Sequence, residues 1–242
     1  TLTKKQWLKL VAIGIIGGSI PFALFFTGLQ TTSALNGALV HKTLFLWVLL
    51  LAIPILKERM TSWQWVGVGL VTLANVLIGG FQGFKFNMGE LLILAATILW
   101  AVENVIAKIV LKDVSSLTVS AARMIFGSII LASFVVMRGG SFAVTQLTAV
   151  QWSWTLLSGA MLTGYVLPWY AALKRAPATY VAVLLVPATL VTNVLSAIFI
   201  THAFPLVQFM NALLVTSGAF LLVRFAKTSA PTPTPEVVSD RA

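Results

Sequence analysis

Eight apolar stretches, each long enough to cross a bilayer, occupy most of this chain of 242 residues. A transmembrane helix needs about 20 apolar residues, whereas a barrel strand alternates polar and apolar residues over about ten. The short links between stretches favour antiparallel neighbours in a compact bundle. We therefore expect an all-α polytopic membrane protein with eight transmembrane helices. They are expected over 10–29, 34–56, 63–81, 89–107, 117–137, 152–173, 178–200 and 206–223.

The composition excludes a water-soluble fold. Hydrophobic residues make up 59% of the chain and charged residues only 9%, against about 25% charged in soluble domains. A chain of this size could not hide so much apolar surface from water. The absence of cysteine excludes disulfides, thiolate metal sites and a cysteine nucleophile.

The basic residues fall almost entirely on one side of the predicted bundle. Of sixteen Lys and Arg, twelve lie on the side of the N-terminus, two on the opposite side and two inside spans. This bias follows the positive-inside rule, so we expect both termini to lie in the cytoplasm. We expect the protein to be located in the inner (plasma) membrane of the cell. The net charge of +10 thus indicates topology and contact with anionic lipid headgroups, and no nucleic acid partner is implied.

An internal repeat appears when the chain is shifted by 144 residues. The first three stretches then fall on the last three without gaps. Because their orientations are opposite, this is an inverted repeat of the kind found in secondary transporters. In the second repeat the stretches 89–107 and 117–137 come before 152–173, but no such stretches come before 10–29. We therefore expect three helices of one five-helix repeat and five of the other, with about two N-terminal helices missing. The predicted divisions are a partial first repeat (1–82), a second repeat (83–226) and a disordered cytoplasmic tail (227–242).

Several short motifs follow one another in a fixed order. Residues 56–61 read LKERMT and 63–67 read WQWVG, while 89–92 read GELL, 99–101 read LWA and 122–125 read ARMI. Together they resemble the EamA-type members of the drug/metabolite transporter superfamily. The resemblance implies a carrier built from two inverted five-helix repeats. It also implies that this chain lacks the first two family helices, and residues 201–204 (THAF) depart from the motif expected there.

Three charged residues lie inside predicted spans, where a charge costs about 3 kcal/mol on insertion scales. Lys42 is about 12 Å deep in its helix, so we interpret it as a contact for an anionic substrate group, with a buried structural ion pair as the alternative. Glu103 and Arg123 are equally far from Asp113 in the link between their helices. We therefore predict that they pair, either as a structural ion pair or in gating or proton coupling.

Further candidates for substrate contact are polar or aromatic residues within the predicted spans. His41 is next to Lys42 but points about 100° away around the helix. Aromatic side chains are candidate cavity walls, although interfacial belts explain many such residues. Prolines within spans are expected to kink their helices. The predicted substrate-binding residues are Lys42, His41, Trp100, Asn104, Tyr165, Trp169 and Asn193, with Trp47 and Tyr170 as further wall candidates and Pro21, Pro54, Pro168 and Pro187 as kinks.

The leading functional hypothesis is a secondary transporter, an exporter of small organic metabolites such as amino acids, that works by alternating access. No nucleotide-binding GxxxxGK[ST] motif occurs, and no cofactor or metal is implied. A membrane-embedded enzyme is less favoured, because neither HExxH nor GxSxG occurs and the two His and six acidic residues are mostly dispersed. A non-transporting or degenerate membrane subunit is the other alternative. The expected partners are a small-molecule substrate and the lipid bilayer, and a homodimer is left open.

Overall fold

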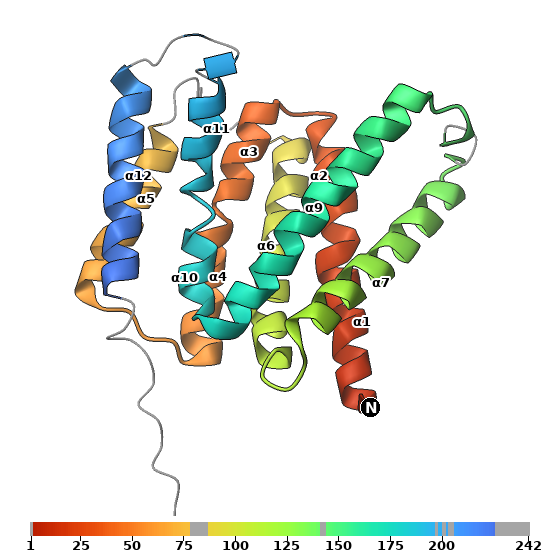
Figure 1. The fold of residues 1–242 in the computed structure, drawn as a ribbon, viewed down its shortest axis with the longest axis horizontal. Helices are drawn as coiled ribbons and strands as arrows, with labels where there is room; N and C mark the ends of the chain where they lie inside the picture. Colours follow the sequence, from red (N-terminus) through yellow and green to blue (C-terminus); the bar gives the residue numbers. More distant parts are fainter. Residues whose placement is uncertain are drawn as a thin grey trace, which may run out of the picture.

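The protein is a bundle of helices without strands in the part of the chain that the computed structural model describes, residues 2–77, 87–140, 144–196, 198–199, 202 and 206–225 (Figure 1). The predicted tail and the boundary between residues 82 and 83 lie outside these residues. The helices are α1 (Lys4–Gly18), α2 (Ile20–Leu29), α3 (Ala34–Lys42), α4 (Leu44–Leu56), α5 (Ser62–Val76), α6 (Met88–Val110), α7 (Ser116–Met137), α9 (Ala149–Arg175), α10 (Ala178–Val183), α11 (Ala188–Ser196) and α12 (Leu206–Arg224).

Six helical segments of the described residues have the length and hydropathy to cross a membrane. This confirms the expected all-α polytopic membrane fold. The other two predicted stretches are also helical but shorter where they are described. One contains α5, and the other contains α10 and α11. The six segments are Lys4–Leu29, Ala34–Leu56, Met88–Val110, Ser116–Met137, Ala149–Arg175 and Leu206–Arg224.

Side-chain caps fix where the helices begin. Thr3, Thr61 and Thr148 each form a capping box with the glutamine three residues on. The threonine oxygen accepts a free backbone N–H of the first turn, and the glutamine accepts the N–H of the threonine. Single caps of the same kind begin α3, α6 and α7, at Ser33, Asn87 and Ser115.

Three of the predicted stretches contain a break in the helix. The first is broken at Ser19, the second at Thr43, and the seventh between α10 and α11, just before Ala188. Of the expected proline kinks, Pro21 and Pro187 stand at such breaks, whereas Pro54 and Pro168 lie within continuous helices. A freed backbone at membrane depth is tolerated where it lies inside the protein.

The helix starts support the repeat of 144 residues. Helices α3 and α10 begin at Ala34 and Ala178, α4 and α11 at Leu44 and Ala188, and α5 and α12 at Ser62 and Leu206. Each pair differs by 144, and the break at Thr43 corresponds to Pro187. The positions of the helix breaks thus also match at this offset, and a similar apolar composition of the two segments would not by itself cause such a match.

The packing of α5 on α12 has the symmetry of an inverted repeat. A Cβ on Gly67 would lie 2.8 Å from the carbonyl oxygen of Gly218, and a Cβ on Gly218 would lie 2.8 Å from that of Gly67. Seven residues away, the Asn211 side chain donates to the carbonyl of Ala74 at 2.6 Å. The two helices therefore run antiparallel. Because Gly67 corresponds to Asn211 and Ala74 to Gly218, the two contacts exchange under the repeat, as contacts do about a two-fold axis.

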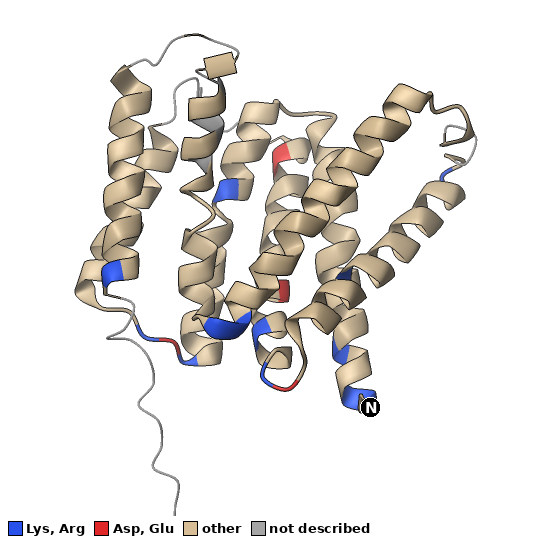
Figure 2. Cartoon of the chain, in the orientation of Figure 1, with Lys and Arg blue, Asp and Glu red and all other residues tan. Residues whose placement is uncertain are grey.

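Helix α6 lies at the centre of the bundle and packs against α1, α2, α3 and α4. Its buried face includes Trp100, Glu103, Asn104 and Ala107, which recur at the spacing of one helix face. Figure 2 shows that Lys and Arg gather at the end of the bundle where α1 begins. We call this end the N-terminal side. It is also the end at which α6 and α9 finish, and α9 begins at the opposite end (Figure 1).

Candidate functional site

A cavity of about 370 Å³ lies among α2, the break between α3 and α4, α6, α7 and α9. We call it the central cavity. It brings together most of the residues that the sequence singles out, although they come from distant parts of the chain. The predicted residues that line it are His41, Trp100, Glu103, Asn104, Arg123, Tyr165 and Trp169.

Glu103 provides the acidic side chain of the central cavity. Only 2% of its surface is exposed. The hydroxyl of Tyr170, from α9, donates a hydrogen bond to its carboxylate. Since a buried carboxylate is costly without partners, this hydrogen bond and the nearby positive charge of Arg123 stabilise Glu103 in place.

Arg123 provides the positive charge, and a helix break orients it. One guanidinium nitrogen donates to the carbonyl of Gly17 at 3.0 Å, and the indole nitrogen of Trp100 donates to the same oxygen at 3.0 Å. In a regular helix this carbonyl would accept the N–H of the residue four positions on. That residue is Pro21, which has no N–H. The proline therefore leaves an acceptor inside the bundle, and Arg123 and Trp100 use it.

Glu103 and Arg123 lie on either side of Gly17. A Cβ at residue 17 would be 2.8 Å from the carboxyl carbon of Glu103 and 3.2 Å from Nε of Arg123. The predicted pair is thus brought together, but its hydrogen bonds go to Tyr170 and to the Gly17 carbonyl. The Nε of Arg123 is buried without a hydrogen-bond partner in the described residues. The site therefore holds an acidic and a basic side chain whose hydrogen bonds go to other groups.

Aromatic rings form the walls between these charges. Trp169 donates to the side-chain oxygen of Asn104 at 2.9 Å, and Asn104 in turn donates to the backbone of Trp100 at 2.8 Å. The His41 ring lies 4.9 Å from that of Trp100, centroid to centroid, and its Nδ1 has no partner in the described residues. These contacts hold the rings in fixed orientations. Phe22, which sequence reasoning missed, adds a cation–π contact with Arg123 at 5.8 Å.

Two predicted site residues are not among those that line the central cavity. Lys42 ends α3 directly before the break at Thr43 and is half-buried. It lies next to His41, and only His41 reaches the cavity, as their angular separation on the helix suggests. Asn193 lies in α11, and its side chain is outside the described part of the structure.

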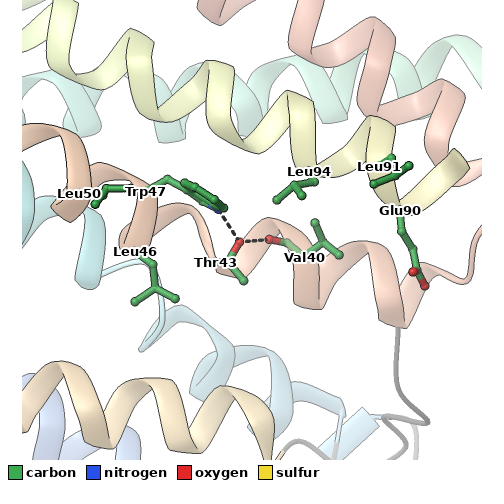
Figure 3. A pocket seen from close by; sticks show the side chains of 8 residues that line it. All are labelled: Val40, Thr43, Leu46, Trp47, Leu50, Glu90, Leu91 and Leu94. Carbon is green, nitrogen blue, oxygen red and sulfur yellow. Dashed lines mark hydrogen bonds between the residues drawn. The ribbon is translucent and has the colours of Figure 1, made fainter. Parts of the chain in front are cut away.

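A second cavity, of about 470 Å³, lies between α3–α4 and α6 and is almost wholly apolar (Figure 3). Thr43 donates to the carbonyl of Val40 at 2.6 Å and accepts the indole N–H of Trp47 at 3.2 Å. These two hydrogen bonds occupy the polar groups at the helix break. Trp47 therefore lines this apolar cavity and not the central one.

A third cavity extends the central one away from the N-terminal side. It has a volume of about 490 Å³. Phe22, Arg123 and Leu162 line both cavities, so the two are adjacent. The third cavity continues along α2 and α7 to Gln30, in the link between α2 and α3, and to Val135 near the end of α7. The central cavity is thus continued toward the end opposite the N-terminal side.

Comparisons with known proteins agree with this fold. A solved crystal structure that covers 94% of this chain matches with a TM-score of 0.76 at 18% identity, and the chain covers 78% of it. An uncharacterized transporter of Synechocystis sp. is 26% identical over 241 residues, which are 91% of this chain and 66% of that protein. The uncharacterized transporter YetK of Bacillus subtilis is 23% identical over 92% of this chain and 69% of its own length.

The chain therefore spans about two thirds of the length of these relatives. The model of the EamA-like transporter family matches residues 1–80 and 87–224. This is nearly all of the described helical bundle, including both halves of the repeat. The chain is a multi-pass membrane protein and belongs to the EamA-like transporter family.

Proposed function

We propose that this protein is a secondary transporter that exports small zwitterionic metabolites, such as amino acids, by alternating access through the central cavity. The observation that carries the proposal is the pair of opposite charges, Glu103 and Arg123, buried among aromatic walls at the centre of the bundle. Intramembrane ionisable residues of this kind mark substrate or ion pathways. The reaction is movement of an intact molecule, so no enzymatic chemistry is assigned to the site.

The chemistry of the cavity suits a molecule with both an amino and a carboxyl group. Arg123 can bind a carboxylate through paired N–H donors, and its buried Nε has no other partner in the described residues. The carboxylate of Glu103 can accept hydrogen bonds from an ammonium group. The rings of Trp100 and Trp169 then face the rest of the substrate. A volume of about 370 Å³ falls within the range of about 300–1,000 Å³ for small-molecule sites.

The location of these groups supports alternating access. His41 belongs to the first repeat, while Glu103, Arg123 and Trp169 belong to the second. A rocking motion between the repeats therefore changes the cavity itself. The matched helix breaks at Thr43 and Pro187 support this motion, because each interrupts a helix beside the central cavity. We assign Lys42, which ends α3 at the first break, and Asn193, which lies in α11 beyond the second, to substrate contact in the other state of the cycle.

A non-transporting membrane subunit remains the second candidate. Such a subunit would keep the cavity but would need a further polypeptide to move a substrate. In both cases we place the protein in the plasma membrane with its described N-terminal side in the cytoplasm, as the distribution of Lys and Arg suggests.

The test is counterflow of the standard amino acids in proteoliposomes that contain the purified chain. We expect uptake of at least one labelled amino acid, and its loss in Glu103→Gln and in Arg123→Gln. Ser133→Ala is the matched control, because Ser133 is an exposed residue of α7 that bonds only its own helix at Ile129. Binding without counterflow would favour the subunit. Counterflow that is unchanged in both charge variants would exclude the central cavity as the substrate site.

A further inference from the structure

Glu58, in the link between α4 and α5, holds the beginning of α10. Its carboxylate oxygens accept the backbone N–H of Ala178 at 2.7 Å and that of Thr179 at 3.0 Å. Two charge-assisted hydrogen bonds to backbone N–H groups are among the stronger polar contacts in proteins. They join residue 58 of the first repeat to α10 of the second.

Two lysines fix the link between α9 and α10, which leads to the beginning of α10. The ammonium group of Lys108, in α6, donates to the carbonyls of Leu173 at 2.6 Å and Ala176 at 2.7 Å. Lys174 donates to the carbonyl of Val114 at 3.0 Å. The link between α9 and α10 is therefore fixed by side chains on both of its flanks. We call Glu58, Lys108 and Lys174 the clamp.

The clamp stands between the central cavity and the N-terminal side. On α6, Glu103 lines the cavity, Ala107 lies one turn further on, and Lys108 follows it. Ala107, Tyr170 and Leu173 are at most 1% exposed, so a packed layer separates the cavity from the clamp. Toward the opposite end, the third cavity continues the central one. The structure is thus closed on the clamp side.

We propose that the contact of Glu58 with α10 is the gate on the N-terminal side and has to break in each transport cycle. The proposal rests on the proposed function, because it assumes that the cavity is reached from both sides. Lys108 and Lys174 donate their hydrogen bonds to residues of their own repeat, so they can move with it. The positive charge of Lys108 also attracts Glu58. Of the three, Glu58 is the one with hydrogen bonds between the two repeats, and a rocking motion between the repeats would separate it from α10.

The corresponding position of the other repeat does not carry a carboxylate. The position that corresponds to Glu58 is His202, 144 residues on. It has no carboxylate that could accept two backbone N–H groups. At the corresponding helix start, α3 is capped instead by its own Ser33. The carboxylate contact therefore favours closure on the N-terminal side over closure on the opposite side.

A single reporter cysteine tests the gate without any knowledge of the substrate. The chain contains no cysteine, so Ala107→Cys introduces the only thiol, behind the clamp. The probe is a membrane-impermeant, positively charged methanethiosulfonate reagent, added to right-side-out and to inside-out membrane vesicles. The measured quantity is the rate of modification from each side.

We expect Glu58→Ala to raise the modification rate from the N-terminal side about tenfold, which corresponds to about 1.4 kcal/mol, with no rise from the opposite side. Arg59→Ala is the matched control: this neighbouring residue is charged and exposed, and it should leave the rate unchanged. A melting temperature measured in detergent shows whether each variant is folded.

Two results would overturn the gate. One is a modification rate of Ala107→Cys that is the same with Glu58 and with Glu58→Ala. The other is a rise in the modification rate of equal size from both sides, which would indicate general loosening of the bundle. Failure of counterflow would leave these rates unaffected, because labelling requires only access and not transport. The failure of the gate and the failure of the proposed transport are therefore distinguishable.

Discussion

Gly17 presents its carbonyl to Arg123 and Trp100, and Pro21, four residues further on, has no N–H with which to compete for it. The orientation of the buried cation in the central cavity thus depends on the covalent structure of a proline on another helix. In most helices a proline marks only a bend. Here it also leaves a hydrogen-bond acceptor free beside the central cavity, the proposed substrate site.

Replacement of Pro21 by alanine should weaken substrate binding. The alanine N–H can bond the Gly17 carbonyl, and Arg123 then loses an acceptor; a hydrogen bond to a charged group contributes about 1.5–3 kcal/mol. We expect a rise in KM of about tenfold in counterflow, with a much smaller change in maximal rate. Pro54→Ala is the control, because Pro54 lies within the continuous helix α4. An equal rise in KM for both variants would contradict this role of Pro21.

Replacement of Gly17 by alanine should destabilise the protein. The added methyl group would overlap the side chain of Glu103, and such overpacking costs typically about 1–3 kcal/mol. Gly69 of α5 is a matched control, since its Cβ would meet nothing within 4 Å. Gly69→Ala should be neutral or stabilise by about 0.5–1 kcal/mol. The melting temperature in detergent, followed by tryptophan fluorescence, should fall for Gly17→Ala alone.

His41 and Lys42 should have different effects on transport. His41 lines the central cavity in this state, so His41→Ala should raise KM. Lys42 is assigned to the other state, so Lys42→Met should lower the maximal rate and leave KM within about twofold, a difference of about 0.4 kcal/mol. Initial rates over a range of substrate concentrations separate the two parameters. If Lys42→Met changed KM alone, Lys42 would be a substrate contact in the present state.

The orientation in the membrane can be measured with single cysteines. Lys112, in the link between α6 and α7, and Arg138, at the end of α7, lie at opposite ends of one helical hairpin. We expect Lys112→Cys to react with an impermeant maleimide only from the cytoplasm, and Arg138→Cys only from outside. The reversed pattern would place the N-terminal side outside the cell and would exclude the positive-inside assignment.

The sequence predicted which residues line the central cavity better than it predicted their hydrogen-bond partners. Charge at equal depth selected Glu103 and Arg123, aromatic character selected Trp169, and the structure places all three around one cavity. The sequence favours Lys42 as a substrate contact because of its depth along the helix. Depth, however, does not say which way a side chain points, and His41 is the neighbour that reaches the cavity.

The sequence by itself determined that this chain is a multi-pass helical membrane protein with an inverted repeat, because span length, charge bias and the offset of 144 residues are properties of the chain in order. Only the tertiary structure decided the partners of Glu103, Arg123 and Glu58. Those partners are largely backbone groups, such as the carbonyl of Gly17 and the N–H of Ala178. Every residue carries such groups, so no pattern of side chains along the sequence distinguishes the ones that packing leaves available.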